Sequence, residues 1–423
     1  MTDRPRSIDA SDLVKHYRAV RTMTESLCET LEPEDFVVQA MPDASPAKWH
    51  LAHTSWFFET FVLKTLNPNH RPIREDANFL FNSYYNAVGE RIARDRRGLL
   101  SRPSIKEIFA YRRDVDRQVL EALNSIDLQS LSEIHPVVTL GLNHEQQHQE
   151  LLLTDIKAAF GANPIRPVFR PENPHDSSIA SPRHWIPNDG GLCEIGHSGS
   201  GFAFDNEGPR HRVFVEPFEF ATRLSTNADY LAFMDAGGYA RPEFWLSDGW
   251  GAKTKEGWTT PLYWEKRPNG YSVFTLHGMR PLDPNEPVTH LSFYEADAFA
   301  RWSGARLPTE AEWEVASAGH PIAGNFLESG SLHPIQANPS GVSQIFGDTW
   351  EWTSSPYVAY PRYRPASGAL GEYNGKFMCN QIVLRGGSCA TPISHVRATY
   401  RNFFGAGTRW QFSGARLARS IEA

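Results

Sequence analysis

The stretch Gly141-Leu-Asn-His-Glu-Gln-Gln-His-Gln-Glu-Leu-Leu-Leu153 contains two histidines separated by three residues. No glycine or proline occurs from Leu142 to Phe160, so the stretch favours a helix. On a helix, His144 and His148 lie one turn apart on the same face, where two imidazoles can bind one metal ion. Glu145 directly after His144 also fits a zinc hydrolase, and a polar helix face explains the pair equally well. A third ligand has to decide between these interpretations.

Composition limits the classes of partner. The chain has 423 residues, enough for two or three domains, and a formal net charge of -7. Its arginines are scattered, which gives no indication of a nucleic-acid partner. The N-terminus has no secretory pattern, no apolar run approaches the roughly 20 residues that span a bilayer, and four cysteines make no disulfide framework. We therefore expect a soluble, cytoplasmic, monomeric protein with reduced thiols.

Apolar periodicity predicts three more helices before the opening stretch. They are expected over Ser11–Leu31, from Ser45-Pro46 to Leu66, and after Ser101–Ser104. Four long helices within residues 1–165 predict an antiparallel bundle, a fold that often binds metals between facing helices.

The pattern changes near Pro164. Residues 166–187 are rich in proline and polar residues, which predicts a linker. From 188 to 423, short β-like segments alternate with loops rich in Gly, Pro and Trp, and only short helices are expected, over Asn227–Met234, Phe293–Ser303 and after Pro308-Thr309. The predicted fold class is therefore an α bundle followed by an α+β domain.

The second predicted helix carries two more histidines, His50 and His53. Because they are three residues apart, we expect at most one of them to face the same point as the pair on the later helix. His53 is followed by Trp56, Phe57 and Phe58, and such an apolar surround suits oxygen chemistry. A third neutral imidazole would complete a three-histidine set with open coordination positions.

Motifs in both halves resemble one known family. Leu51-Ala-His-Thr-Ser-Trp-Phe-Phe-Glu59, together with His144-Glu-Gln-Gln-His148, resembles the DinB-like helical domain of the ergothioneine-forming sulfoxide synthases (hercynine oxygenases, the EgtB family). The second half resembles the formylglycine-generating-enzyme/sulfatase-modifying domain, a variant of the C-type lectin fold. The matching stretches are Glu207–His211, Pro287–His290, Ala305–Glu314, Gly347–Trp352 and Arg385–Ser388. Each motif is short, but their order over both halves is specific.

The resemblance implies a mononuclear non-haem enzyme whose Fe(2+) is held by His53, His144 and His148. Its substrates would be dioxygen, hercynine (the trimethylated betaine of histidine) and a thiol, with L-cysteine expected. The sulfur would be joined to C2 of the hercynine imidazole, giving hercynyl-cysteine sulfoxide. γ-Glutamylcysteine as the thiol and an ovothiol-type 5-histidylcysteine sulfoxide as the product are the alternatives.

The resemblance also implies roles beside the metal. Family members use a tyrosine as proton donor, which here implies Tyr84 or Tyr85. Gln147 would bind the hercynine imidazole. The alternatives are a core tyrosine and a helix-surface glutamine.

Two further pairs could contact the substrates. Arg94 and Arg97 could bind a substrate carboxylate or form a solvated basic surface. Trp410 and Phe412 could hold the trimethylammonium group through cation–π attraction, or be core aromatics. Trp350 and Trp352 are expected in a buried strand after a turn.

Three other functions each leave a feature of the sequence unexplained. A formylglycine-generating copper enzyme needs two cysteines after Arg-Gly-Gly-Ser, but only Cys389 follows, with Thr391 and His395 further on. A zinc hydrolase or thiol transferase does not explain the second domain. A lectin-like binding module does not explain the three histidines.

Overall fold

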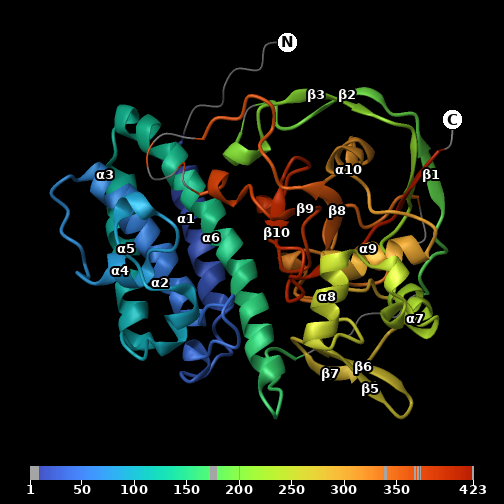
Figure 1. The fold of residues 1–423 in the computed structure, drawn as a ribbon. Helices are drawn as coiled ribbons and strands as arrows, with labels where there is room; N and C mark the ends of the chain where they lie inside the picture. The colour runs from blue at the N-terminus through green and yellow to red at the C-terminus, as the bar shows by residue number, and fades with distance from the viewer. Residues whose placement is uncertain are drawn as a thin grey trace. The chain divides into compact units, whose positions relative to one another are not determined.

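The computed structural model describes residues 9–171, 179–199, 201–337, 341–365, 368, 371 and 373–421. The chain forms two compact units (Figure 1). The helical unit consists of Met1–Pro164, Gly199–Phe202 and Ala366–Tyr373, and the sheet unit of Ile165–Ser198, Ala203–Pro365 and Asn374–Ala423. Tyr373, which the sequence assigned to the second domain, is grouped with the helical unit.

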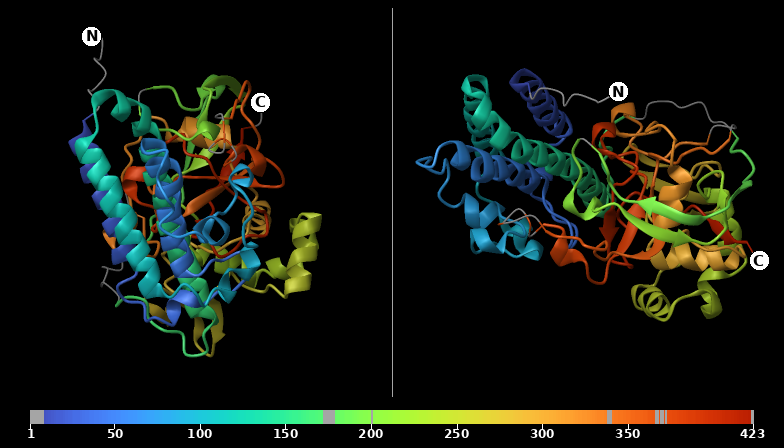
Figure 2. Two further views of the ribbon diagram at one scale, coloured as in Figure 1. Left: turned by 90° about the vertical axis from the view of Figure 1, so that its left-hand side faces the viewer. Right: turned by 90° about the horizontal axis from the view of Figure 1, so that it is seen from above.

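Four long helices build the helical unit. They are α1 (Ala10–Ser26), α2 (Ala47–Phe58), α5 (Ile105–Ser125) and α6 (Leu128–Ala162), with the short α3 (Lys64–Leu66) and α4 (Ala77–Phe81). A π-helical turn over Glu59–Leu63 joins α2 to α3. Both α1 and α2 pack against α5 and α6, and Figure 2 shows these helices from two further directions. The predicted bundle is confirmed.

The helix ends follow from local sequence. The Ser104 side chain accepts from the Glu107 backbone N–H, and the Glu107 carboxylate accepts in return, so α5 begins with a capping box. Asp127 caps α6 by accepting from Gln129 and Ser130. The helix α6 starts earlier than the sequence suggested and continues through Pro136, which lacks an N–H to donate. Burial of apolar side chains on both sides of Pro136 offsets that loss.

Glu145 connects three helices of the bundle. Its carboxylate accepts from Arg112 at 2.6 Å and from Arg21 at 2.8 Å, and all three side chains are buried. Burial alone would raise the pKa of Glu145, but the two guanidinium groups outweigh it and lower the pKa to about 2. Glu145 is therefore an ionised structural carboxylate, which argues against a hydrolase base at this position.

Four small sheets form the frame of the sheet unit. Their strand orders are β1-β4-β12, β10-β9-β8-β11, β2-β3 and β5-β6-β7. The strands are β1 (Trp185–Asn188), β2 (Gly191–Ile195), β3 (His211–Val215), β4 (Phe218–Ala221), β5 (Trp264–Arg267), β6 (Gly270–Thr275), β7 (Gly278–Pro281), β8 (Trp350–Pro356), β9 (Ile382–Arg385), β10 (Asn402–Phe404), β11 (Ser413–Gly414) and β12 (Ala418–Ser420). The helices are α7 (Asn227–Asp235), α8 (Ser247–Glu256), α9 (Phe293–Trp302) and α10 (Glu310–Ser317). The predicted α+β character is confirmed, whereas α8 was not predicted.

The segment predicted to be a linker is partly structured. Within residues 166–187, Trp185 begins β1, which pairs antiparallel with β4. Phe169 is buried, and its backbone N–H donates to the Leu276 carbonyl. Residues 172–178 lie outside the described residues. Because the segment is rich in polar residues, its sequence pattern did not predict the strand pairing of β1 or the contact between Phe169 and Leu276.

The signature Gly347–Trp352 forms the predicted turn and buried strand. Gly347 and Asp348 have positive φ angles of 82° and 59°, and β8 starts two residues later. A Cβ on Gly347 would lie 2.5 Å from the Asn325 carbonyl oxygen, so this position requires glycine. Trp350 and Trp352 are fully buried, as expected of structural residues.

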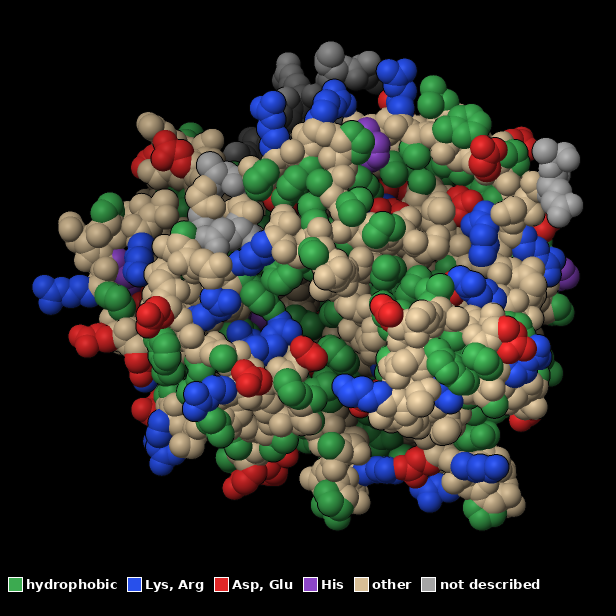
Figure 3. All heavy atoms as spheres, in the orientation of Figure 1, with side chains coloured by type: hydrophobic (Ala, Val, Ile, Leu, Met, Phe, Trp, Pro, Cys, Tyr) green, Lys and Arg blue, Asp and Glu red, His purple; other side chains and the backbone are tan. Residues whose placement is uncertain are grey.

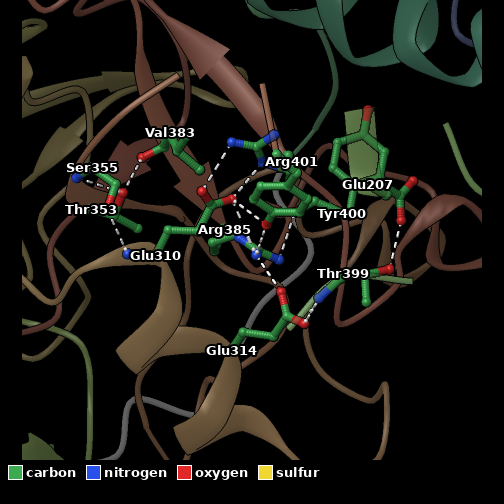
Figure 4. Close-up of polar contacts among 12 residues, drawn as sticks. Glu207, Glu310, Glu314, Thr353, Ser355, Val383, Arg385, Thr399, Tyr400 and Arg401 are labelled. Atoms are coloured by element: carbon green, nitrogen blue, oxygen red, sulfur yellow. Dashed lines mark hydrogen bonds and ion pairs between the residues drawn. The ribbon is translucent and has the colours of Figure 1, made fainter. Parts of the chain in front are cut away.

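A cluster of buried opposite charges, Glu310, Glu314, Arg385 and Arg401, fixes α10 against β9 (Figure 4). Arg385 donates to Glu314 at 2.5 Å and lies 3.1 Å from Glu310. Arg401 donates to both carboxylate oxygens of Glu310. We call these four residues the ion-pair cluster.

The surface carries mixed charge. On the face drawn in Figure 3, basic and acidic side chains are interspersed. Among the described residues, no helix is long and apolar enough to cross a membrane. The four cysteines are free, and Cys389 is buried.

Candidate metal centre

Three buried histidines converge in the helical unit. His53 lies on α2, and His144 and His148 lie one turn apart on α6. Each offers one ring nitrogen, and these three atoms lie within 4.8 Å of one another. We call this set the three-histidine group. The structure thus brings together all three ligands that the sequence predicted.

The histidines are held in their neutral form. Burial lowers the pKa of His144 to about 4, and burial with the neighbouring imidazoles lowers the pKa of His53 and His148 well below the usual value of 6.5. Neutral imidazole is the form that binds a metal ion through its free nitrogen.

Hydrogen bonding identifies that nitrogen in His53. Its Nδ1 lies 2.6 Å from the Phe81 carbonyl oxygen, which can only accept, so Nδ1 carries the proton. Nε2 therefore has the lone pair, and it lies 3.2 Å from Nε2 of His144. In the tautomer of His144 that has its proton on Nδ1, two lone pairs would face each other, and a shared cation would relieve their repulsion. The chemistry of the donor set therefore fits a metal ion.

Aromatic rings enclose the three-histidine group. Trp49 stacks on His53 with ring centroids 4.6 Å apart and an interplanar angle of 10°, and Phe57 packs against His144 at 5.0 Å. Gly141 lets α6 approach these rings, because a Cβ there would lie 2.7 Å from Phe58 and 2.8 Å from Phe57. This wall excludes water from one side of the site.

Of the two tyrosines predicted as proton donors, Tyr85 lies beside that wall, with its ring centroid 6.4 Å from that of Phe57. Tyr85 is buried, with ring centroids 5.1 Å from Phe61 and 5.8 Å from Trp56. Tyr84 is half-buried, and the Arg94 guanidinium lies 5.4 Å from its ring centroid.

A third tyrosine, which the sequence analysis missed, contacts one of the three histidines. The Tyr373 ring meets His144 edge-on with centroids 5.7 Å apart, and its hydroxyl donates to Gln147 Oε1 at 2.9 Å. Burial raises the pKa of Tyr373, so the hydroxyl keeps its proton at neutral pH. Tyr373 lies in a glycine-rich segment, 226 positions from Gln147. No periodic pattern in the sequence links the two residues, so their contact could not be predicted. Gln147, by contrast, was predicted.

The two predicted arginines have different environments. Arg97 is buried, donates to Ser45 Oγ at 2.9 Å, and lies 3.4 Å over the ring of Trp49. Among the described residues, its buried Nε has no hydrogen-bond partner. Arg94 is exposed. Burial, with the like charge of Arg94, lowers the pKa of Arg97. An anion beside Arg97 would offset this cost.

The aromatic pair predicted to hold a trimethylammonium group belongs to the sheet unit. Phe412 is fully buried, and its ring packs against His290 with centroids 4.9 Å apart. Trp410 is half-buried. Their predicted role stays a prediction.

Family models match both halves of the chain. The Sulfatase-modifying factor enzyme 1-like domain matches residues 175–334 and 325–421, and the DinB superfamily matches residues 16–152. These matches confirm the fold classes inferred from the motifs.

Three full-length relatives carry the same name. The chain is 31% identical over 413 residues to a hercynine oxygenase of Mycolicibacterium smegmatis, covering 90% of this chain and 93% of the relative. It is 31% identical to the hercynine oxygenase of Mycolicibacterium thermoresistibile, with 90% and 89% covered. A hercynine oxygenase of Mycobacterium tuberculosis is 29% identical, with 97% and 99% covered.

Proposed function

The chain belongs to the family of hercynine oxygenases, and on that premise we propose that it is a non-haem iron(II) enzyme that forms a C–S bond between hercynine and a thiol. L-Cysteine is the proposed thiol and hercynyl-cysteine sulfoxide the proposed product, within ergothioneine biosynthesis. γ-Glutamylcysteine as the thiol, and a 5-histidylcysteine sulfoxide as the product, are the alternatives that the experiments below distinguish.

The three-histidine group carries the proposal. His53, His144 and His148 would hold the iron through three neutral nitrogens, a set that leaves coordination positions open. Iron bound there would supply dioxygen activation and coordination of the thiolate. Because the ligands are neutral, the positive charge of the ion is left for an anionic thiolate to balance. Zinc proteases differ in keeping a general base beside the ion, whereas Glu145 is held by two arginines.

Gln147 and Tyr373 are the proposed contacts on the imidazole side of hercynine. Gln147 projects from α6 between two of the ligands, and its carbonyl oxygen accepts the Tyr373 proton. In the proposed complex, the Gln147 side chain orients the substrate imidazole. We assign the proton donor to the Tyr373 hydroxyl, because its ring contacts a ligand directly, whereas Tyr84 and Tyr85 remain the alternatives from the sequence.

Arg94 and Arg97 are the proposed contacts for the carboxylate of the thiol substrate. The partnerless, buried Nε of Arg97 supports this role, and Trp49 places that guanidinium in a column with the ligand His53. A carboxylate held near an exposed and a buried guanidinium would position the sulfur for reaction. Trp410 and Phe412 remain the proposed contacts of the trimethylammonium group.

Metal selectivity and oxygen uptake test this function. The purified chain is stripped of metal, titrated anaerobically with Fe(II), Zn(II) and Cu(I), and then mixed with oxygenated buffer. We expect one Fe(II) per chain, and rapid oxygen uptake only when both hercynine and cysteine are present. Selective zinc or copper binding with no oxygen uptake would refute the proposal. Single turnover with cysteine or γ-glutamylcysteine identifies the thiol.

A further inference from the structure

A fourth histidine lies against the three-histidine group without belonging to it. His50, on α2, is buried, and its Nδ1 lies 2.8 Å from Nδ1 of His148. Its other nitrogen, Nε2, lies 3.0 Å from Oδ2 of Asp155, a buried residue of α6. Asp155 also accepts from the backbone N–H of Ser45 at 2.7 Å. A continuous chain of hydrogen bonds therefore runs from Ser45 through Asp155 and His50 to His148.

The proton positions along this chain of hydrogen bonds follow from its acceptor, the Asp155 carboxylate. An ionised Asp155 only accepts, so Nε2 of His50 carries a proton. Neutral His50 then has its lone pair on Nδ1, and the 2.8 Å contact requires His148 to donate from its own Nδ1. The lone pair of His148 is consequently on Nε2. The opposite direction, donation from His50, would place the proton of His148 on Nε2 and remove that lone pair.

We propose that His50 and Asp155 are positioning residues, which fix the tautomer and ring orientation of His148 so that Nε2 binds the metal. This inference rests on the proposed metal centre and deepens it. A carboxylate acting through a second imidazole also increases the electron density on the ligand nitrogen, which strengthens its bond to the ion.

The other two predicted ligands, His53 and His144, differ from His148 in their hydrogen-bond partners. The Phe81 carbonyl fixes the tautomer of His53. His144 Nδ1 has no hydrogen-bond partner within the part of the chain that is described. His148 is therefore the one ligand whose orientation depends on an ionised group, and the interaction reaches it through another side chain.

The substitution Asp155→Leu tests this role, because leucine is close to aspartate in shape but accepts no hydrogen bond. Asparagine would not test it, since its amide oxygen would still accept from Ser45 and His50 at the position of Oδ2. Without an acceptor at residue 155, the proton of His50 is no longer held on Nε2, so His50 can donate from Nδ1 and leave the proton of His148 on Nε2. The size and fold of the site barely change. We expect the affinity for Co(II), a spectroscopic substitute for Fe(II), to fall about 10–100-fold. The visible d–d absorption of the bound Co(II) should also change, which a purely structural role for Asp155 would not produce.

Glu59→Met is the matched control. Glu59 is a buried carboxylate of the same bundle, and it accepts from His70 at 3.1 Å, from the Ile73 backbone N–H at 2.6 Å and from the Tyr111 hydroxyl at 2.5 Å. Like Asp155, it contacts a histidine and a backbone N–H, but its histidine is not one of the three predicted ligands or His50. We expect it to leave the Co(II) affinity and spectrum unchanged. His50→Phe, which keeps a ring in place but removes both hydrogen bonds, should weaken Co(II) binding as Asp155→Leu does.

The outcomes separate this inference from the proposed function. If the parent protein binds Co(II) and both Asp155→Leu and His50→Phe retain its affinity and spectrum, the positioning role is wrong while the metal centre stands. If the parent protein binds no Co(II) or Fe(II), the metal centre itself is wrong. Circular dichroism and urea unfolding of each variant verify that the bundle is intact before titration.

Discussion

The helical unit and the sheet unit each bury a group of polar side chains, with opposite results. In the ion-pair cluster of the sheet unit, two carboxylates face two guanidinium groups, and the opposite charges compensate within the protein. In the three-histidine group, burial keeps the imidazoles neutral, and three of their ring nitrogens lie within 4.8 Å of one another. The first arrangement is complete, whereas the second, on the proposed function, is completed by a cation from outside. Burial of polar side chains therefore indicates a ligand site only where other side chains of the protein do not already pair with them.

The largest effect is expected at the three-histidine group. His144→Gln should abolish metal binding and activity, because one of three ligands is lost. The free energy of unfolding of the metal-free chain should fall by less than the about 3–5 kcal/mol typical of breaking a buried ion pair. Metal titration and urea unfolding measure the two effects. His135→Gln, on the same helix α6, is the control and should retain both metal and activity.

The reverse pattern is expected in the ion-pair cluster. Arg385→Met leaves Glu310 and Glu314 without a shared partner, which should lower the free energy of unfolding by about 3–5 kcal/mol. Metal affinity should not change.

Arg301→Met is the control for this prediction. It removes a partly exposed pair with Asp297 and should cost less than about 1 kcal/mol. Equal stability of the two variants would show that the ion-pair cluster does not hold the sheet unit together.

Gly141→Ala tests how closely α2 and α6 must approach. The added Cβ would contact the rings of Phe57 and Phe58, so the helices or rings must shift, at about 1–3 kcal/mol. Because the ligands come from both helices, metal affinity should fall as well. Gly251→Ala in α8 has no atom within 4 Å of the new Cβ and should stabilise the chain slightly. Unchanged metal affinity in Gly141→Ala would show that the spacing is not critical.

Tyr373→Phe removes one hydroxyl beside the ligands and should leave stability nearly unchanged. We expect the ratio of sulfoxide to cysteine sulfinate to fall about tenfold, equivalent to about 1.4 kcal/mol between two barriers. Mass spectrometry of the products measures the ratio. Tyr84→Phe and Tyr85→Phe serve as the comparison. If Tyr85→Phe changes the ratio and Tyr373→Phe does not, the proton donor predicted from the sequence is the right one.

The smallest effect is expected from pH. Burial alone would raise the pKa of Glu310, but Arg385 and Arg401 outweigh it and lower the pKa below the unfolded value of 4.5. The folded chain then binds fewer protons here than the unfolded chain, so this stabilisation is present above pH 4.5 and is lost as pH falls below it. Urea unfolding between pH 3 and 7 should show the loss. If the free energy of unfolding has the same pH dependence in the parent chain and in the Arg385→Met variant, this prediction is wrong.

Features that depend on residues close together in the sequence could be predicted. The spacing of His144 and His148 on one helix predicted their common face, and the bundle and the turn before β8 followed from periodicity and signature residues. The contact of Tyr373 with His144 could not be predicted, because it joins distant segments without a periodic pattern. His50 was correctly expected to differ from His53, but its partner Asp155 is more than a hundred positions away. The early start of α6 was missed because Pro136 indicates a helix break.

The origin of the product oxygen tests the central claim most directly. The iron-loaded chain is mixed with hercynine, cysteine and ¹⁸O₂, and the product is analysed by mass spectrometry. We predict hercynyl-cysteine sulfoxide with sulfur on C2 of the imidazole and one ¹⁸O atom, and no product from the His144→Gln variant. Formation of cysteine sulfinate alone, or the same product from a chain that lacks a complete three-histidine group, would contradict the account.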